Sequence, residues 1–552
     1  MKQLTQNLKD GTMELLEVPT PHIGQNSILI KTFFSAISAG TEGRSVRDAR
    51  MGYLSKAKAR PKEFKQVLNS AKKVGFTETY KNVMNKLTSP STLGYSCSGE
   101  VVEIGNGVTK FKIGDKVAAG GQGAVHGEYA CVLENLCVKI PESVDLKHAA
   151  LTTVGSICMQ GVRQADVKIG EFCAVIGLGL LGQITLQLLN AAGVSVIGID
   201  LDTQKVLLAE ENGAYLAIDR NQEGLEETVY NHTNGIGVDS VLITAATMSN
   251  DPINLAGRLI RKKGKIVSVG RVGTDFDRDV FYLKELDLRM SCSYGPGRYD
   301  NQYEENGVDY PVGYVRWTEN RNMQAFVNLL SNNKININYL ITHLFDFNDA
   351  KKAYDMINLN EEKYLGIILK YNLESTSKHS INFDNYSVKS DDLNIGFIGA
   401  GSFAQKFLLP NLKGKVNLIG VATSKGSNAS HIAKKFGFQN ATCHADELIA
   451  DKKIDTLFIA TRHNTHFEYI VKALKNGKNV FVEKPLCLTE EELEEITKIY
   501  KTSKRSLMVG FNRRFAPHIS KVIEILGRNS VKTINYRVNL GPLAVNHWTQ
   551  NP

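Results

Sequence analysis

Short apolar runs alternate with amphipathic segments in two separate parts of this 552-residue chain. Between residues 150 and 290, runs such as 238–244 and 265–270 have the apolar character of buried parallel strands, and segments of helical periodicity separate them. The same alternation returns after residue 393, with the runs 416–422 and 454–460. Strands that alternate with helices predict a parallel sheet covered on both faces, so we expect two α/β domains in tandem.

The residues before 150 are predicted to be rich in β-structure, because their strand-like runs are bounded by Gly, Asn and Pro. An insertion at residues 44–87 interrupts these runs and repeats its apolar residues at helical spacing. Residues 372–392 are polar and lack periodicity, as is typical of a linker. We therefore expect five parts: residues 1–150 with 300–371, residues 151–299, the linker 372–392, residues 393–515, and residues 516–552.

The composition excludes several classes of protein. Hydrophobic residues make up 42% of the chain and charged residues 22%, which is typical of an ordinary globular protein. No apolar run approaches the length of a membrane-spanning helix, and the N-terminus lacks the apolar core of a signal peptide. The 8 cysteines show no paired spacing, which favours a reducing compartment. We expect a cytoplasmic protein without a membrane partner.

Basic residues are concentrated in the insertion at 44–87, where they outnumber acidic residues by roughly four to one. One interpretation is a solvated helical face. The other is a lid or cradle for a phosphorylated or carboxylated substrate. The net charge of +9 is modest for this length, and no nucleic-acid-binding module is recognisable, so no nucleic-acid partner is expected.

A glycine fingerprint follows the first apolar run of the first α/β domain. Gly177, Gly179 and Gly182 have the G-x-G-x-x-G spacing, which permits a tight turn, a close approach of pyrophosphate and close packing of the next helix. Asp200 ends the next strand about twenty residues later, where a carboxylate would accept a ribose 2′-hydroxyl and repel a 2′-phosphate. The first site is predicted to bind NAD(H).

A second fingerprint, with Gly399, Gly401 and Ala404, opens the second α/β domain. No acidic residue ends its second strand, where Thr423 and Ser424 stand instead and Lys425 follows. Small hydroxyls and a cation accommodate a 2′-phosphate, so the second site is predicted to bind NAD(H) or NADP(H).

Residues 1–370 resemble the medium-chain dehydrogenase/reductase family, in which a Rossmann domain is inserted into a GroES-like β domain. The resemblance is carried by the fingerprint and by three short segments, Ser38-Ala-Gly-Thr-Glu42, Leu93-Gly-Tyr-Ser96 and Phe111-Lys-Ile-Gly-Asp-Lys-Val117. Zinc members of that family place cysteine and histidine ligands where this chain has Ala39 and Tyr95. Catalytic zinc needs about three protein ligands, so no zinc and no other metal is expected.

Without a metal, another group must polarise the substrate oxygen at the first site. The resemblance places Thr41 where the family keeps a proton-relay hydroxyl, and Tyr95 is a candidate hydrogen-bond donor to an oxyanion. Alternatively, Tyr95 only fills the space of the missing metal. Arg298 lies in a Gly-Pro-Gly turn between two tyrosines and is a candidate substrate ligand, although an exposed turn is the plainer interpretation.

Residues 393–552 resemble the Gfo/Idh/MocA family. Besides the fingerprint, the resemblance is carried by Ala460-Thr-Arg-His-Asn-Thr-His466, Val482-Glu-Lys-Pro485 and Gly510-Phe-Asn-Arg-Arg-Phe515. It implies that Lys484 is a catalytic residue beside the nicotinamide, that His466 positions cofactor or substrate, and that the peptide before Pro485 is cis. By the same resemblance, Glu483 contacts the cofactor, and Asn512 and Arg513 contact the substrate.

The family continues through a large antiparallel sheet, of which this sequence contains only the beginning, near residues 531–536. The predicted fold is therefore α/β, with a GroES-like β domain and a Rossmann domain followed by a second Rossmann domain and an incomplete antiparallel sheet. An exposed sheet edge predicts a homo-oligomer or a partner.

Together the halves resemble bacterial bi-domain oxidoreductases associated with surface-polysaccharide metabolism. The resemblance implies hydride transfer to or from a hydroxyl or carbonyl of a carbohydrate or nucleotide-sugar, with the nicotinamide carrying the hydride. The alternative is a non-catalytic dinucleotide-binding or regulatory protein, which the missing zinc ligands and the short sheet would suit.

Overall fold

The protein is described by a computed structural model that covers residues 1–52, 55–56, 58, 61–383, 392–527, 531, 533–535 and 537. The chain forms two compact units. The first consists of Met1–Leu16 and Ile23–Thr376, and the second of Glu17–His22 and Ser377–Pro552.

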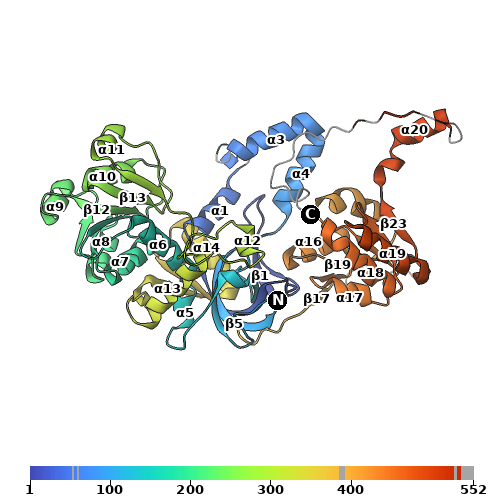
Figure 1. The fold of residues 1–552 in the computed structure, drawn as a ribbon, viewed down its shortest axis with the longest axis horizontal. Helices are drawn as coiled ribbons and strands as arrows, with labels where there is room; N and C mark the ends of the chain where they lie inside the picture. The colour runs from blue at the N-terminus through green and yellow to red at the C-terminus, as the bar shows by residue number, and fades with distance from the viewer. Residues whose placement is uncertain are drawn as a thin grey trace. The chain divides into compact units, whose positions relative to one another are not determined.

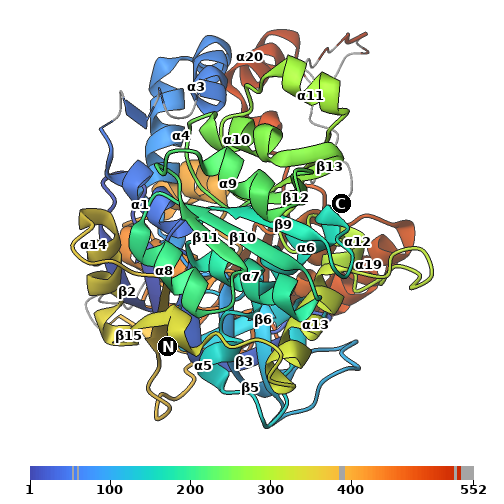
Figure 2. The ribbon, with the colours of Figure 1, turned by 90° about the vertical axis from the view of Figure 1, so that its left-hand side faces the viewer.

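A parallel sheet of six strands forms the core of one half of the first unit, in the order β11-β10-β9-β12-β13-β14. The strands are β9 (Phe172–Ile176), β10 (Ser195–Asp200), β11 (Leu216–Asp219), β12 (Val238–Ile243), β13 (Ile260–Ser268) and β14 (Asp287–Met290). The flanking helices are α6 (Thr152–Ala165), α7 (Leu180–Ala191), α8 (Thr203–Glu211), α9 (Leu225–His232), α10 (Asp251–Leu259) and α11 (Arg278–Lys284), and Figure 2 shows α7 and α8 with the strands β9–β11.

Helices cover both faces of this sheet because successive side chains of a strand point to opposite faces. Cys173 and Val175 of β9 belong to a buried cluster that includes residues of α6, α7 and α8. Ala174 and Ile176 belong to a second cluster, formed with residues of α9 and α10. The apolar run that precedes the fingerprint is therefore buried on both sides, as a central parallel strand requires.

A mainly antiparallel sheet forms the other half of the first unit, in the order β15-β16-β3-β5-β6-β8, and β7 also pairs with β3. Its strands are β3 (Ser27–Ile37), β5 (Ser96–Ile104), β6 (Lys116–Gly120), β7 (Tyr129–Leu133), β8 (Cys137–Lys139), β15 (Ile341–Asp346) and β16 (Gly366–Lys370). A small sheet of β1 (Lys2–Gln6), β2 (Met13–Glu17) and β4 (Ser91–Thr92) accompanies it. Because β16 pairs with β3, residues after the parallel sheet return to the N-terminal strands.

The helices outside the parallel sheet of the first unit fall into two groups. The insertion contributes α1 (Thr41–Arg50), α3 (Pro61–Val74) and α4 (Phe76–Thr88), drawn in blue in Figure 1. The other group is α5 (Leu146–Ala149), α12 (Asn301–Glu304), α13 (Glu319–Ser331) and α14 (Ala350–Leu359). None of the described helices of the chain is long and apolar enough to span a membrane.

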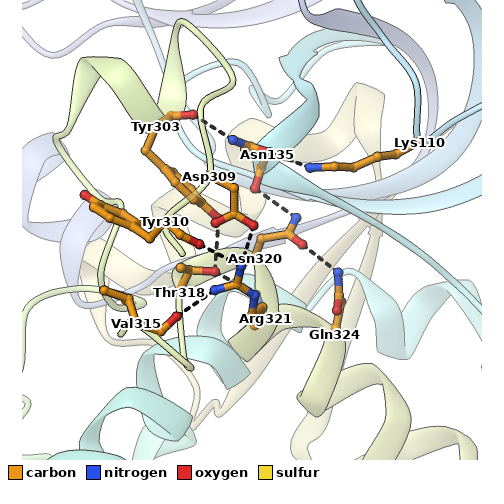
Figure 3. A network of polar contacts seen from close by, with 10 residues as sticks. All are labelled: Lys110, Asn135, Tyr303, Asp309, Tyr310, Val315, Thr318, Asn320, Arg321 and Gln324. Carbon is orange, nitrogen blue, oxygen red and sulfur yellow. Dashed lines mark hydrogen bonds and ion pairs between the residues drawn. The ribbon is translucent and has the colours of Figure 1, made fainter. Parts of the chain in front are cut away.

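A polar network fixes the irregular segment before α13 against the antiparallel sheet (Figure 3). The side-chain amide of Asn135 donates to the Tyr303 carbonyl at 2.7 Å, and that of Asn320 donates to the Asn135 carbonyl at 2.9 Å. Arg321 donates to the Val315 carbonyl at 2.7 Å and forms an ion pair with Asp309. Buried amides without partners are costly, so these pairings hold the segment in one conformation.

The second unit contains one sheet in the order β17-β20-β19-β18-β21-β22-β23, and every neighbouring pair except β17–β20 is parallel. Its strands are β17 (Ser380–Asn382), β18 (Asn394–Ile398), β19 (Asn417–Ala422), β20 (Asn440–Thr442), β21 (Thr456–Ile459), β22 (Asn479–Glu483) and β23 (Leu507–Gly510). The helices are a π-helical turn (Ala404–Leu408), α15 (Leu409–Leu412), α16 (Gly426–Phe436), α17 (Ala445–Ala450), α18 (His466–Lys475), α19 (Glu490–Ser503) and α20 (Pro517–Leu526).

Two short segments extend the second unit beyond the predicted Rossmann domain. Within the predicted linker, β17 pairs antiparallel with β20, and residues 384–391 lie outside the described part of the chain. The residues Glu17–His22 also belong to this unit: Thr20 donates its backbone N–H to the Lys378 carbonyl at 2.8 Å. The antiparallel sheet predicted to begin near residue 531 falls almost wholly outside the described residues.

Replacement of Phe326 by Ala is expected to destabilise the first unit by about 3–5 kcal/mol, because the ring is fully buried between α13 and α6 and its loss leaves a cavity. A Cβ placed on Gly155 of α6 would lie 2.3 Å from this ring, so the helices are already in close contact. Urea unfolding followed by circular dichroism measures the effect. Tyr314→Ala, at a residue that is 91% exposed, is the control, and equal midpoints for both variants would contradict the assignment.

Candidate functional sites

The first fingerprint forms a cradle between β9 and α7. Gly177 has φ +99°, and a Cβ on it would lie 2.6 Å from the Ala245 nitrogen. A Cβ on Gly182 would lie 1.9 Å from the Gly177 carbonyl oxygen, so only glycine lets the helix approach the turn this closely. Gly179, which caps α7, has open space around its Cβ position. The backbone N–H groups there are accessible to an anion, so the cradle fits the pyrophosphate of a dinucleotide.

Asp200 ends β10 beside this cradle and is half-buried. One carboxylate oxygen accepts the Leu178 N–H at 2.6 Å, and the other accepts the Asp202 N–H at 2.9 Å. The carboxylate therefore holds the fingerprint turn and keeps a negative charge at the position expected for the ribose. Its place at the carboxyl end of the strand neighbouring β9 agrees with a role in binding the ribose hydroxyls.

The second fingerprint has the same construction after β18. Gly399 has φ +80°, and a Cβ on it would lie 2.6 Å from the Thr461 side chain, whereas the Cβ position of Gly401 is open. Ala404 is buried and begins a π-helical turn in place of a regular helix. A dinucleotide pyrophosphate fits this second cradle for the same reason as the first.

Of the residues that follow β19, Thr423 is buried, whereas Ser424 and Lys425 are exposed to solvent and could contact a cofactor. The Thr423 hydroxyl donates to the Lys425 carbonyl at 2.9 Å, and the Thr423 side chain is buried. Ser424 and Lys425 are exposed. Of the two hydroxyls predicted to bind cofactor, that of Ser424 is the accessible one.

Lys484 lies at the carboxyl edge of the sheet that carries the second fingerprint. The strands β18, β21 and β22 are parallel neighbours, so Gly399, Thr461 and Lys484 all lie at the same edge. The Lys484–Pro485 peptide is cis, as the resemblance predicts, and the Lys484 side chain is exposed. Burial, followed by electrostatic interactions with His466 and Lys484, lowers the pKa of His463, so His463 is a third ionisable side chain of this cluster.

His466 is fully buried beneath this edge. Its Nδ1 lies 2.7 Å from the Pro485 carbonyl oxygen, and its Nε2 lies 3.3 Å from the Thr461 carbonyl oxygen. A carbonyl only accepts, so Nδ1 donates to Pro485. His466 therefore ties the loop after β21 to the loop that carries Lys484, and its predicted part in the site is that of a positioning residue.

The last motif of the second unit lies next to the same loop. Asn512 donates its side-chain amide to the Glu483 carboxylate at 3.1 Å. A Cβ on Gly510 would lie 2.8 Å from the same carboxylate, so a larger residue there would have to displace the Glu483 side chain. Arg513 is exposed on the turn Asn512–Phe515. Asn512, a predicted substrate ligand, is thus hydrogen-bonded to Glu483, a predicted cofactor ligand.

In the first unit, Tyr95 and Thr41 come together although they lie 54 positions apart in the sequence. Burial raises the pKa of Tyr95 to about 12. Hydrogen bonds with Ser38 and Thr41 oppose this effect, and the charge of Glu42 adds to it. The Tyr95 phenol is therefore protonated at neutral pH and can donate a hydrogen bond to an oxygen.

A buried polar network, which the sequence did not reveal, lies beneath these two residues. The Glu42 carboxylate lies 3.0 Å from His126 Nε2, accepts the Ser38 N–H at 3.1 Å, and accepts the Tyr354 hydroxyl. His126 Nδ1 lies 2.7 Å from the Ser35 hydroxyl. Glu42 stands in a segment that carried the family resemblance, but its partner follows 84 residues later, so only the fold joins them.

The chemistry of these side chains does not fit a catalytic zinc ion. Two ligand positions hold a methyl group and a phenol, in Ala39 and Tyr95, and the nearby Glu42 and His126 are already bound to each other. Among the residues that the structure describes, no three His, Cys, Asp or Glu side chains are grouped so as to hold a metal.

Arg298, the predicted substrate ligand of the first unit, is largely buried and forms an ion pair with Glu304 at 2.5 Å. Its guanidinium lies 4.2 Å from the centre of the Tyr299 ring. The neighbouring Glu319 is fully buried, and burial raises its pKa to about 9. The Arg298 side chain thus lies in a largely buried ion pair, although Pro296 of the turn and Tyr299 are exposed.

Glu319 is expected to make the protein less stable as the pH rises. Its pKa is about 9 in the folded protein and near 4.5 in the unfolded chain, so the folded state holds a proton that the unfolded state releases between these values. The contribution is fully present below about pH 4.5 and is lost towards pH 9. Glu319→Gln should therefore raise the free energy of unfolding at pH 8 by about 2–4 kcal/mol and change little at pH 4.5.

Urea unfolding of wild type and Glu319→Gln at both pH values measures this difference. Glu304→Gln is a useful comparison, because Glu304 is paired with Arg298 and its replacement should destabilise the protein. An equal effect of Glu319→Gln at both pH values would contradict the protonated state.

Three family models match parts of the chain. The alcohol dehydrogenase GroES-like domain matches residues 69–142, the zinc-binding dehydrogenase model matches residues 181–306, and the oxidoreductase family with an NAD-binding Rossmann fold matches residues 393–511. The matches support an oxidoreductase with medium-chain dehydrogenase and Gfo/Idh/MocA modules. Because one of these models is of a zinc-binding dehydrogenase, the absence of zinc stays a prediction.

Similar proteins cover the first unit. D-arabitol-phosphate dehydrogenase of Enterococcus avium is 26% identical over 313 residues, which is 50% of this chain and 82% of that protein. D-xylulose reductase of Scheffersomyces stipitis is 28% identical over 309 residues, 49% of this chain and 80% of that protein.

A solved structure supports the fold. A short chain alcohol dehydrogenase of Escherichia coli CFT073 complexed with NADH aligns with a TM-score of 0.51 and 19% identity, over 67% of this chain and 99% of that protein. This likeness and the sheets of the second unit confirm the predicted α/β fold, with its GroES-like domain and two Rossmann-type sheets.

Proposed function

We propose that this protein is a nicotinamide-dependent oxidoreductase that transfers hydride to or from a hydroxyl or carbonyl of a carbohydrate or nucleotide-sugar. The observation that carries the proposal is the position of Lys484 at the same sheet edge as the open cradle at Gly401. A ligand binds at the carboxyl ends of parallel strands, so a cofactor in the cradle and a substrate beside Lys484 would lie next to each other.

The similar proteins support the class of substrate. The names of D-arabitol-phosphate dehydrogenase and D-xylulose reductase refer to a sugar alcohol phosphate and a sugar. The joining of two such modules in one chain favours surface-polysaccharide biosynthesis. We further propose a homo-oligomer in the cytoplasm, a compartment that the free cysteines of the described residues would suit.

In the second unit, we assign a different role to each side chain of the candidate site. When bound, the nicotinamide supplies the hydride donor or acceptor. Lys484 would contact the substrate oxygen and give or take its proton, while Asn512 and Arg513 would bind the rest of the substrate. His466 would keep the Lys484 loop against the loop after β21 through its hydrogen bond with Pro485. A proton-transfer group must lie within hydrogen-bond reach of the reacting oxygen, which this edge provides.

In the first unit, we propose a zinc-independent site at Tyr95. The protonated phenol would donate a hydrogen bond to the substrate oxygen, and Thr41 would exchange the proton with it. Glu42 and His126 would keep this pair in position, because their mutual bond anchors the turn that bears Ser38 and Thr41. Arg298 is held by its ion pair with Glu304, so we expect it to support the turn that precedes it.

A second candidate function is the binding of dinucleotide without turnover. The observation that favours it is the departure of the first site from zinc-ligand chemistry at Ala39 and Tyr95. Under this alternative, both cradles would bind a nicotinamide nucleotide, and no sugar or polyol would be converted by the wild-type protein.

Asp200→Asn is expected to weaken NADH binding at the first site and to reduce its preference over NADPH by about tenfold or more, because the negative charge that repels a 2′-phosphate is removed. Nucleotide binding at the second cradle must be prevented, so that the test measures the first site alone. Gly401→Asp introduces a carboxylate at an open phosphate position, so the measurement uses Gly401→Asp as the reference and compares the double variant with it.

Calorimetric titration with NADH and NADPH measures the preference. Asp202→Asn is the control, because Asp202 caps the next helix and forms an ion pair with Lys363. An unchanged ratio of the two affinities in the Asp200 variant would contradict the predicted NAD(H) preference.

Lys484→Ala is expected to lower turnover at the second site by at least about a hundredfold and to leave nucleotide affinity nearly unchanged, because the lysine serves the substrate proton rather than the pyrophosphate. Turnover is followed by NAD(P)H absorbance on a panel of sugars, polyols and nucleotide-sugars, and affinity by NAD(P)H fluorescence. Lys475→Ala, at an exposed lysine that ends α18, is the matched control. Nucleotide binding without wild-type turnover on the panel would favour the non-catalytic alternative.

A further inference from the structure

The insertion in the first unit holds the entire excess of positive charge of the chain. The chain has 66 basic and 57 acidic residues, and residues 44–87 contain 12 of the basic and 3 of the acidic ones. The remaining residues therefore carry 54 charges of each sign. A net charge confined to one short segment produces a local potential that attracts anions.

The same segment exposes large apolar side chains. Phe76 is 80% exposed and Tyr80 is 67% exposed, one turn apart on α4. Phe64 and Leu68 have the same spacing on α3 and are 47% and 44% exposed. Residues four apart lie on one face of a helix, so each helix presents an apolar pair to solvent.

Small residues lie in the contact between the two helices, and the two apolar pairs remain exposed beside it. Figure 1 shows α3 and α4 as a helical hairpin, joined at Gly75 with φ +87°. Among the described side chains of the hairpin, those of Ala71 and Thr79 are buried, and the Thr79 hydroxyl donates to the Ser70 hydroxyl at 3.3 Å. The four side chains of the apolar pairs therefore remain between 44% and 80% exposed in the folded hairpin.

Exposed basic side chains accompany these pairs. They are Lys65 and Lys72 on α3 and Lys81 and Lys86 on α4. Glu78 lies 3.9 Å from Lys81, and Glu63 is the other acidic residue of the two helices. The surface therefore combines exposed aromatic and aliphatic residues with an excess of positive charge, as interfacial amphipathic helices do.

We propose that the hairpin of α3 and α4 binds the surface of an anionic lipid bilayer. The apolar pairs would enter the boundary between headgroups and acyl chains, and the lysines would contact lipid phosphates. The sequence prediction of no membrane partner rested on the lack of a spanning segment, whereas a surface-bound hairpin needs none. Such binding would bring the enzyme to substrates or products carried at a membrane.

Charge disfavours one of the two other possible occupants of this surface, and the apolar residues disfavour the other. A second copy of the hairpin would bring two strongly basic segments together, which repel. A nucleic acid would suit the lysines but would leave aliphatic Leu68 without a matching contact, and the segment has no recognisable nucleic-acid-binding module. An anionic bilayer satisfies the charge and the apolar pairs together.

Cosedimentation of the full-length protein with vesicles tests the proposal. Wild type should bind vesicles of phosphatidylcholine mixed with phosphatidylglycerol, should not bind pure phosphatidylcholine, and should be released by high salt. The double variant Phe76→Ser with Tyr80→Ser should bind the anionic vesicles about tenfold more weakly, and so should Lys65→Glu with Lys72→Glu. Circular dichroism and NADH binding of each variant verify that the protein remains folded.

Matched controls replace exposed residues elsewhere in the first unit. Tyr282 and Tyr314 are 67% and 91% exposed, and their double replacement by Ser should leave vesicle binding unchanged. The exposed Lys262 and Lys334, both changed to Glu, control for net charge. Absence of wild-type binding to either vesicle would overturn the proposal in favour of a solvated face.

Two further outcomes would also overturn it. Heparin or polynucleotide binding that persists in the Phe76 and Tyr80 variant, together with no vesicle binding, would show a polyanion site. Loss of an oligomer in the same variant, measured by analytical ultracentrifugation, would show an interface between copies. Neither result depends on turnover, so failure here is distinguishable from failure of the proposed oxidoreductase function.

Discussion

The close approach of α7 to the end of β9 is the constraint on which the first unit depends. The carbonyl of Gly177 occupies the space that any side chain at Gly182 would need, so the helix can lie this close to the turn only with glycine at residue 182. Asp200 reaches the same turn from the neighbouring strand and accepts the Leu178 N–H. The anion cradle is therefore a direct result of how tightly β9 and α7 pack. The second unit has a similarly close contact at Gly399, where a Cβ would lie 2.6 Å from the Thr461 side chain.

The two units use this common frame in different ways. In the second, the ionisable residues lie on adjacent parallel strands and meet at an edge that chain topology alone creates. In the first, the residues near Thr41 and Tyr95 belong to a buried network, in which the Glu42 carboxylate contacts His126, the Tyr354 hydroxyl and the Ser38 N–H at once. A buried carboxylate with several donors is well satisfied, and such a network resists replacement of any single member. The interior of this part of the first unit is therefore strongly organised.

Sequence reasoning succeeded where the required residues are local. The glycine spacing and the strand periodicity each lie within a few residues, and the fold class followed from them. The Glu-Lys-Pro motif is also local, and the cis peptide at Lys484 followed from the family resemblance that this motif carries. It failed where partners are distant in the chain. Nothing near Glu42 indicates His126, and nothing near Glu319 indicates that it is buried beside Arg298. Burial of an acidic residue at the start of a helix contradicts its usual exposed location, so only the three-dimensional structure reveals it.

The residues Glu17–His22 give the chain an unusual connectivity. The polypeptide enters the second unit near its beginning, returns to the first unit, and passes to the second again only after Thr376. The units are thus joined by three covalent crossings rather than one. After a single proteolytic cut in the segment that contains β17, the C-terminal fragment would be held to the rest of the chain only by non-covalent contacts, which include those of residues 17–22 within the second unit. A gene fragment that starts at residue 393 would encode a second unit lacking both its N-terminal peptide and an edge strand, and a circularly permuted arrangement would be needed to supply them.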